Sequence, residues 1–217
     1  MKHSVFLTLV AMAGAFTASA GTLSFASGDA TNEFNSRSFT NVTIGVNPAW
    51  EQNHPGGGNW ISYADTGTPG SVTPNNVVAF PIVPTALFFE YFTLGSSPIT
   101  SSILNVWADD TAGVAVNNHI IQLPNGTQDG ACAAGAIGCT PGEGLHLDIS
   151  QYLRPGNNIL SFAVYQREGG PFGLLYDGQV NSASLPTETP EPATMGLMGM
   201  AIAAIGFFAR KRTTTEV

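Results

Sequence analysis

The chain has 217 residues and a net charge of −8, and 43% of its residues are hydrophobic whereas only 10% are charged. This apolar content is enough for a packed core and excludes general disorder. Residues 21–189 contain thirteen carboxylates, three arginines and no lysine, a net charge of −10. A surface of this kind repels phosphate backbones, so nucleic acid is excluded as a partner.

The first 20 residues have the pattern of a secretory signal peptide. Lys2 supplies a positive charge, an apolar stretch covers residues 5–16, and Ala18-Ser19-Ala20 is an A-x-A cleavage site. This apolar stretch is too short to cross a bilayer as a helix. We therefore expect residues 1–20 to direct export.

Residues 21–186 predict one all-β domain. They contain no long 3.6-residue hydrophobic period, and short β-branched and aromatic runs are separated by Gly, Pro, Asn and Ser. Alternation places Phe88, Glu90 and Phe92 on one face of a strand. About ten strands in one domain favour two packed sheets, a jelly-roll sandwich. The predicted strands are residues 22–26, 42–46, 59–63, 77–80, 86–94, 102–108, 113–116, 119–123, 145–147, 159–165 and 173–180.

The loop-rich segment 49–65 is the candidate for carbohydrate binding. A sugar ring is bound by an aromatic face on its apolar side, with carboxylates or amides for its hydroxyl groups. One of the two tryptophans in this segment can instead anchor the core, and strand parity prevents Trp60 and Tyr63 from facing the same side. The predicted sugar-binding residues are Trp50, Trp60, Tyr63, Asp65 and, from a second loop, Arg167.

Two later segments resemble galactose-binding-like domains. Residues 104–110 and 113–118 resemble their "strand, acidic turn, strand, Asn-Gly" hairpin, with Asn118 in place of the usual glycine. Residues 147–160 resemble their "D-I-[ST]-x-x-L-x-x-G-x-N-x-[LI]" segment, which also occurs in sugar-binding domains of many glycosidases. The resemblance covers residues 103–180 and implies the jelly-roll fold. It leaves the ligand open, because many domains of this fold bind no sugar.

Calcium is the only cofactor for which the sequence offers candidate ligands. Asp109 and Asp110, with Asn117 or Asn118 across the predicted hairpin, offer the hard oxygen ligands that calcium prefers. The alternative is an exposed turn in which the aspartates bind their own backbone. Two further candidate ligands in the first loop are Asp29 and Glu33.

No catalytic residues are predicted. His54, His119 and His146 accompany no known catalytic motif, and we expect them to be structural or solvated. Paired carboxylates for glycoside hydrolysis depend on spatial distance, which the sequence does not give. Cys132 and Cys139 are expected to form a disulfide in an exported protein, whereas a metal pair lacks further ligands nearby.

The C-terminal region has the features of a membrane-targeting signal. Residues 187–192 form a Pro-rich spacer, and residues 193–209 are uncharged and span about 25 Å as a helix, the lower limit for a transmembrane helix. Residues 210–217 form a basic tail that stays cytoplasmic. The alternative is a C-terminal core helix. The residues that carry the Pro-Glu-Pro sequence and the basic cluster of this region are Pro190, Glu191, Pro192, Arg210, Lys211 and Arg212.

This order of a Pro-Glu-Pro motif, a short apolar helix and a basic cluster resembles the PEP-CTERM sorting signal of Gram-negative bacteria. The resemblance implies an exosortase as processing partner and a precursor anchored in the inner membrane. It also implies a mature form at the cell surface or in the extracellular matrix of bacteria that make exopolysaccharide or biofilm. The expected function is non-catalytic, with weak binding to exopolysaccharide. The alternatives are a structural or adhesive surface protein without a sugar site, and a polysaccharide hydrolase.

Overall fold

The computed structural model describes residues 21–183 apart from residues 30–32, 53, 55, 69–71, 75–79, 127–131, 133–135 and 168. The predicted signal peptide, spacer, transmembrane helix and basic tail lie outside the described residues. So does most of the predicted strand 77–80, whose last residue, Phe80, lies in a turn.

The described chain contains eleven strands and a single turn of 3₁₀ helix. The elements are β1 (Gly21–Ala26), β2 (Glu33–Asn35), β3 (Val42–Thr43), β4 (Ile61–Ser62), β5 (Ala86–Leu94), β6 (Ile99–Asp109), β7 (Thr111–Val116), β8 (His119–Gln122), β9 (Leu145–Leu147), η1 (Ser150–Tyr152), β10 (Gly156–Tyr165) and β11 (Gly173–Ser182). No helix among the described residues has the length and apolar character that a membrane span requires.

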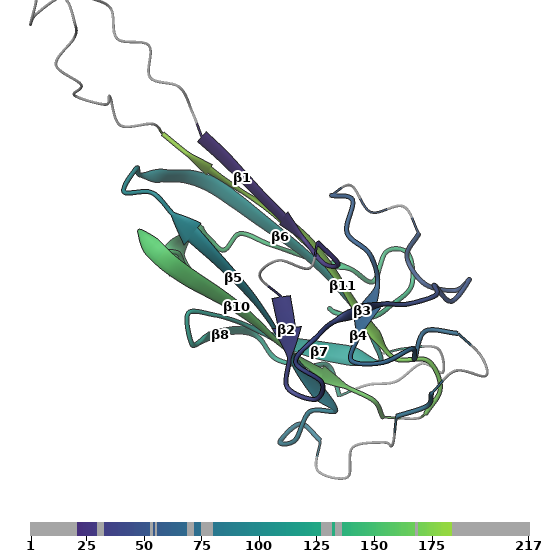
Figure 1. Ribbon diagram of the computed structural model, residues 1–217. Coiled ribbons are helices and arrows are strands. Elements are labelled where there is room, and N and C mark those ends of the chain that lie inside the picture. The colour runs from purple at the N-terminus through teal and green to yellow at the C-terminus, as the bar shows by residue number, and fades with distance from the viewer. Residues whose placement is uncertain are drawn as a thin grey trace, which may run out of the picture. The chain divides into compact units, whose positions relative to one another are not determined.

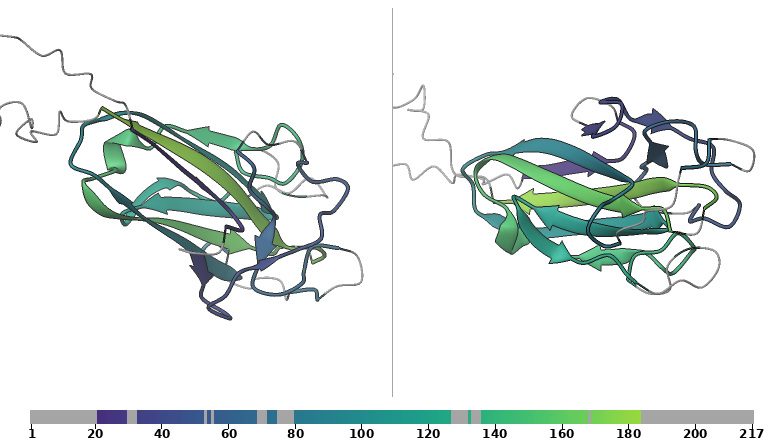
Figure 2. Two further views of the ribbon diagram at one scale, coloured as in Figure 1. Left: turned by 45° about the horizontal axis from the view of Figure 1, so that its top comes forward. Right: turned by 90° about the horizontal axis from the view of Figure 1, so that it is seen from below.

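The strands form two antiparallel sheets, which confirms the predicted sandwich (Figures 1 and 2). The six-stranded sheet has the order β3-β4-β11-β6-β9, and β1 pairs with β11 as well. The five-stranded sheet has the order β2-β5-β10-β7-β8. Figure 1 shows β1, β6 and β11 side by side in one layer and β5 beside β10 in the other.

The core lies between the inward faces of the two sheets. Phe88, Glu90 and Phe92 of β5 are all buried, as the alternation predicted, whereas Tyr91 is 43% exposed. Across the core, Phe162 of β10 stacks on Tyr176 of β11 with 4.5 Å between ring centroids. Alternation along single strands is therefore enough to assign the inward residues of β5.

The prediction of a hairpin around Asp109 and Asp110 is wrong. β6 and β7 follow each other directly, but β6 pairs with β11 and β9, whereas β7 pairs with β10 and β8. The two aspartates therefore connect the sheets, and their side chains are buried instead of lying in an exposed turn. The hairpin at Asn117-Asn118 is confirmed, since both residues have the positive φ (49° and 68°) of a tight turn between β7 and β8.

Candidate functional site

A second hydrophobic cluster covers the outward face of the six-stranded sheet. Trp107 of β6 and Leu175 of β11 point outward and are buried by loop residues, which include the disulfide. Trp50 and Trp60, from the segment before β4, pack on each other with 4.2 Å between ring centroids. They are 1% and 2% exposed. The prediction that these two residues present a stacking face to a sugar is therefore wrong, because they cover an apolar sheet face.

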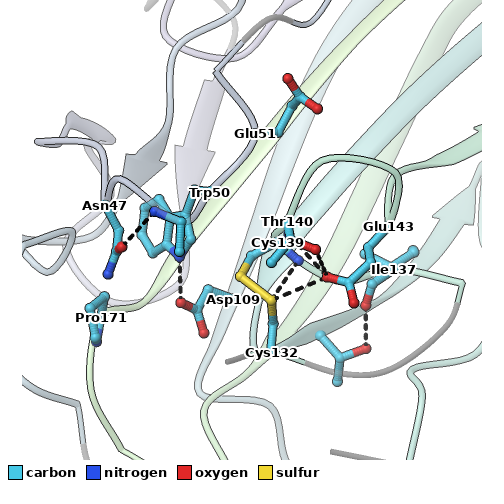
Figure 3. Close-up of a disulfide and its surroundings, with 12 residues drawn as sticks. Asn47, Trp50, Glu51, Asp109, Cys132, Ile137, Cys139, Thr140, Glu143 and Pro171 are labelled. Carbon is cyan, nitrogen blue, oxygen red and sulfur yellow. Dashed lines mark hydrogen bonds between the residues drawn. A yellow bond between two sulfur atoms is a disulfide. The ribbon is translucent and has the colours of Figure 1, made fainter. Parts of the chain in front are cut away.

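Polar contacts hold this loop to the sheet. The indole N–H of Trp50 donates to Oδ2 of Asp109 over 2.7 Å, and that of Trp60 donates to the backbone oxygen of Glu51 over 3.0 Å. The Glu51 N–H donates to the Cys139 oxygen over 2.8 Å. The predicted disulfide joins Cys132 and Cys139 beside these contacts (Figure 3).

Asp109 is a buried acid and does not form the predicted calcium site. Its pKa is raised to about 9, first by burial and then by a hydrogen bond with Asp110 and the charge of Asp110, while the bond from Trp50 acts in the opposite direction. Asp110 accepts the backbone N–H of Arg167. Asn117 follows the opposite end of β7 and donates to Tyr152, so it cannot complete a ligand set with the aspartates.

The other three predicted sugar-binding residues do not gather with the tryptophans. Tyr63 is half-buried, with its ring 5.7 Å from that of Phe172 and the Arg37 guanidinium 5.1 Å from its centroid. Asp65 is exposed. The Arg167 guanidinium lies 4.3 Å from the ring centroid of Phe80. The structure therefore does not assemble the predicted five-residue site.

The same loop segment nevertheless forms a pocket of about 190 Å³, which we call the loop pocket. Val46, which is 38% exposed, contributes apolar wall beside the buried Ile44 and Trp60. The polar groups come from the segment that the sequence singles out, but not from the five predicted residues. These groups, an acid, two amides and an imidazole, match the chemistry expected for binding sugar hydroxyls. The lining residues are Thr43, Ile44, Val46, Glu51, Gln52, His54, Gly58, Asn59 and Trp60.

His54 is held at the loop pocket by a row of polar side chains across the sheet. Asp177, Asn105 and His146 are direct cross-strand neighbours on β11, β6 and β9. Asp177 contacts Nδ1 of His54 over 3.3 Å and accepts from Nδ2 of Asn105 over 2.6 Å. Oδ1 of Asn105 lies 2.6 Å from Nδ1 of His146, and Nδ1 must be the donor because an amide oxygen can only accept.

Glycines allow the loop to approach this row. A Cβ on Gly56 would lie 2.2 Å from Cγ of Asp177, and one on Gly58 would lie 2.6 Å from the Tyr176 oxygen. Both distances are shorter than any side chain tolerates. The glycine-rich run of the sequence is therefore required for placing His54 directly over Asp177.

A separate group of acids, which we call the carboxyl cluster, combines the two first-loop calcium candidates with one further residue. One oxygen from each of Asp29, Glu33 and Glu90 lies within 4.8 Å of the others. Glu33 and Glu90 are cross-strand neighbours on β2 and β5. Sequence reasoning missed Glu90, although its place among apolar core residues, Phe88 and Phe92, was a visible signal.

The carboxyl cluster is hydrogen bonded and partly protonated. The Tyr176 hydroxyl lies 2.5 Å from Oε1 of Glu33 and 3.0 Å from Oε2 of Glu90, and the Gly28 N–H donates to Glu33. The pKa of Glu90 is raised to about 7, first by burial and also by the charges of Glu33 and Asp29, while the Tyr176 bond acts in the opposite direction. Because one phenol proton cannot serve two carboxylates, a protonated Glu90 completes the network.

Comparisons with solved structures return proteins of low similarity. A family 35 carbohydrate binding module from Clostridium thermocellum aligns with a TM-score of 0.37 and 13% identity, over 73% of this chain and 97% of that one. An exo-β-1,3-galactanase from Phanerochaete chrysosporium aligns with a TM-score of 0.36 and 11% identity, over 74% of this chain and 29% of that one. A family 2 glycosyl hydrolase from Bacteroides cellulosilyticus aligns with a TM-score of 0.37 and 14% identity, over 73% of this chain and 20% of that one. Similarity at this level supports neither a shared ligand nor a shared activity.

The C-terminal region has a specific match. The comparison with curated proteins gave none, but residues 188–212 match the model of the PEP-CTERM protein-sorting motif. The match includes the predicted Pro-Glu-Pro motif and the basic cluster Arg210-Lys211-Arg212, which lie outside the described residues. Residues 188–212 are thus a PEP-CTERM sorting motif, and the chain is an exported protein of Gram-negative type whose precursor is membrane-anchored by its C-terminal region.

Proposed function

We propose that the protein is a non-catalytic surface or matrix protein that an exosortase processes and that binds carbohydrate weakly through the loop pocket. The observation that carries this proposal is the lining of that pocket. Glu51, Gln52, His54 and Asn59 place acid, amide and imidazole groups beside apolar wall in a hollow of about 190 Å³. Polar groups around an apolar wall are what a neutral sugar requires.

The orientation of His54 supports a binding role. Asp177 holds Nδ1 of His54, and Nε2 of the same ring has no hydrogen-bond partner within the described part of the chain. A pre-oriented imidazole needs no reordering when a hydroxyl group binds to it, which lowers the entropic cost of binding. In contrast, the buried acids Asp109 and Glu90, at 3% and 2% exposure, are placed too deep to flank a glycosidic bond.

The second candidate function is a structural or adhesive surface protein without a sugar site. It is favoured by the burial of all three tryptophans in one cluster, because tryptophan is the most effective surface for sugar stacking and none is accessible here. Both candidates share export and sorting, so a direct binding measurement separates them.

The experiment is an array of neutral and acidic glycans probed with the full-length protein in detergent. The first candidate expects binding to at least one glycan and about three- to tenfold weaker binding by Asn59→Ala, the effect of losing one hydrogen bond. Gln179→Ala is the matched control, since Gln179 is exposed on β11 and does not line the loop pocket. Absence of binding to every glycan refutes the first candidate and leaves the structural role.

We also propose that the carboxyl cluster binds a structural calcium ion. Asp29, Glu33 and Glu90 offer hard oxygen donors, and a cation among them relieves the charge repulsion that adds to burial in raising the pKa of Glu90. Calcium would stabilise the first loop and β2, and it would take no part in binding the carbohydrate.

A further inference from the structure

A stack of three aromatic rings lies on the outward face of the five-stranded sheet. Phe34 of β2 stacks on Phe89 of β5 with 4.7 Å between ring centroids and on Tyr91 of β5 with 5.4 Å. The interplanar angles are 22° and 15°, so the three rings are nearly parallel. Tyr91 ends this stack and is 43% exposed. It is an aromatic surface that the core does not use.

The end of the stack borders a hollow with polar side chains. Tyr91, Thr93 and Asn157 line a depression of about 430 Å³, together with Phe92 and Asn158. Thr93 and Asn157 are cross-strand neighbours on β5 and β10, so the pairing of these strands brings them together beside the ring. The depression therefore combines a ring with an amide and a hydroxyl group.

The polar groups at this hollow are oriented and only partly used. The Thr93 hydroxyl donates to Oδ1 of Asn157 over 3.0 Å. That bond leaves the Nδ2 group of Asn157 as a free donor and the Thr93 oxygen as a free acceptor within the described part of the chain. The neighbouring Asn158 differs, since it is 1% exposed and bonded to Arg154, Gly156 and Asn117. Asn158 is structural, whereas Asn157 is available to a ligand.

We infer that Tyr91, Thr93 and Asn157 form a second carbohydrate site, which takes one ring of a neutral sugar polymer. The apolar face of the sugar ring continues the aromatic stack on Tyr91, and its hydroxyl groups bind the Asn157 amide and the Thr93 oxygen. This inference extends the proposed carbohydrate binding from the loop pocket to a different sheet. Two weak sites on one domain would bind a polymer with higher affinity than either site alone.

The charges favour a neutral sugar. All five residues that line the hollow are uncharged, and residues 21–189 have a net charge of −10, which repels a polyanion. Arg154 lies beside the hollow, where its Nε–H donates to the backbone oxygen of Asn157 over 3.3 Å. An acidic glycan would use this guanidinium, so acidic and neutral glycans are compared in the test.

The experiment measures binding of the full-length protein in detergent to the same glycan array, followed by titration with the neutral glycan that binds best. Tyr91→Ala is expected to weaken binding about tenfold, and Asn157→Ala about threefold, while Tyr91→Phe retains most of the affinity because it keeps the ring. Ile120→Ala is the matched control, since Ile120 is 70% exposed on β8 and lies outside this hollow. Asn157→Ala removes only an exposed bond, so it provides a test even if Tyr91→Ala disturbs the stack.

The outcomes separate this inference from the proposed function. If the wild type binds and Asn59→Ala weakens binding while Tyr91→Ala and Asn157→Ala do not, the second site is refuted and the loop pocket stands. If binding is confined to acidic glycans and depends on Arg154, the neutral-sugar assignment is refuted. If the wild type binds no glycan, both the second site and the proposed function are refuted.

Discussion

The indole N–H of Trp50 donates to the carboxyl group of Asp109 over 2.7 Å, in a place where both side chains are almost completely buried. Trp50 belongs to the loop that carries His54, and Asp109 ends β6. Because burial and the neighbouring Asp110 together raise the pKa of Asp109 to about 9, the acceptor is a neutral acid at physiological pH. This one bond therefore connects the candidate binding loop to the sheet without a buried charge.

Replacing Trp50 by phenylalanine should destabilise the protein. The variant removes the donor to Asp109 and leaves a buried polar group unsatisfied, which costs about 1–3 kcal/mol in addition to the smaller ring volume. Urea unfolding followed by circular dichroism measures the change. Trp107→Phe is the matched control, because Trp107 is also buried and its indole N–H has no hydrogen-bond partner within the described part of the chain. Unchanged stability of Trp50→Phe would show that the bond contributes nothing.

Stability should fall as pH rises. The pKa values of Glu90 and Asp109 are raised to about 7 and about 9, so the folded state holds both protons more tightly than the unfolded chain does. Their contribution is complete below the unfolded pKa values of about 4 and is lost as pH rises through 7 and then 9. Thermal unfolding at pH 5, 7 and 9 measures the trend. Glu90→Gln should flatten the lower step and Asp109→Asn the upper one, and a midpoint that rises from pH 5 to 9 would contradict both assignments.

Calcium should stabilise the protein, and the effect should depend on pH. A ligand that binds only the folded state at 100 times its Kd adds about 2.7 kcal/mol. Because Glu90 must lose its proton to bind a cation, the increase in unfolding temperature should be larger at pH 8 than at pH 5. Thermal unfolding with calcium and with a chelator makes the comparison. Glu90→Gln should abolish the response and Asp109→Asn should keep it, so an equal response in both variants would place calcium elsewhere.

Removing the disulfide should loosen the cluster around it. Cys132 and Cys139 are seven residues apart, and a ring of this size contributes about 2–2.5 kcal/mol in the loop-entropy estimate. The double variant Cys132→Ser/Cys139→Ser should lose stability up to this amount in urea unfolding. Its tryptophan fluorescence should also shift to longer wavelength, since all three tryptophans pack with the disulfide. Reduced wild-type protein is the control, and an unchanged spectrum in both samples would contradict the packing role.

Alanine at Pro190, Glu191 and Pro192 should block processing. The substitution removes the Pro-Glu-Pro motif within the matched residues 188–212, so a full-length precursor should accumulate in the inner membrane. Immunoblots of membrane and medium fractions measure this. Alanine at Thr213, Thr214 and Thr215, which follow the matched residues, is the control and should leave processing normal. Normal release of the Pro-Glu-Pro variant would refute exosortase recognition at this motif.

Local patterns predicted those parts of the fold that depend on neighbouring residues. The bounds predicted for β5 agree with the observed Ala86–Leu94, because alternating large side chains determine both the strand and its buried face. The Asn117-Asn118 turn agrees because two adjacent residues with positive φ allow few other structures. The strand β2 was missed, since three residues are too few for a period to be detected.

The candidate sites could be predicted only in part. The composition of the loop segment predicts a binding region, and it leaves open that one of Trp50 and Trp60 anchors the core. The structure buries both tryptophans in one cluster with Trp107 and Leu175. Glu90 joined Asp29 and Glu33 through the pairing of β2 with β5, and Asn157 came to Tyr91 through the pairing of β5 with β10. Each of these contacts depends on the pairing register of strands that are distant in the sequence, and a single sequence contains no local signal for that register.

The sequence by itself therefore determined the charge, the strand-rich composition and the sorting motif at residues 188–212, because a linear signal is read without folding. Only the tertiary structure decided that Asp109 is a buried neutral acid, that the tryptophans belong to a second core and that Tyr91 remains accessible. The physical reason is that a side chain is buried only when other side chains pack against it, and those side chains come from residues far away in the sequence.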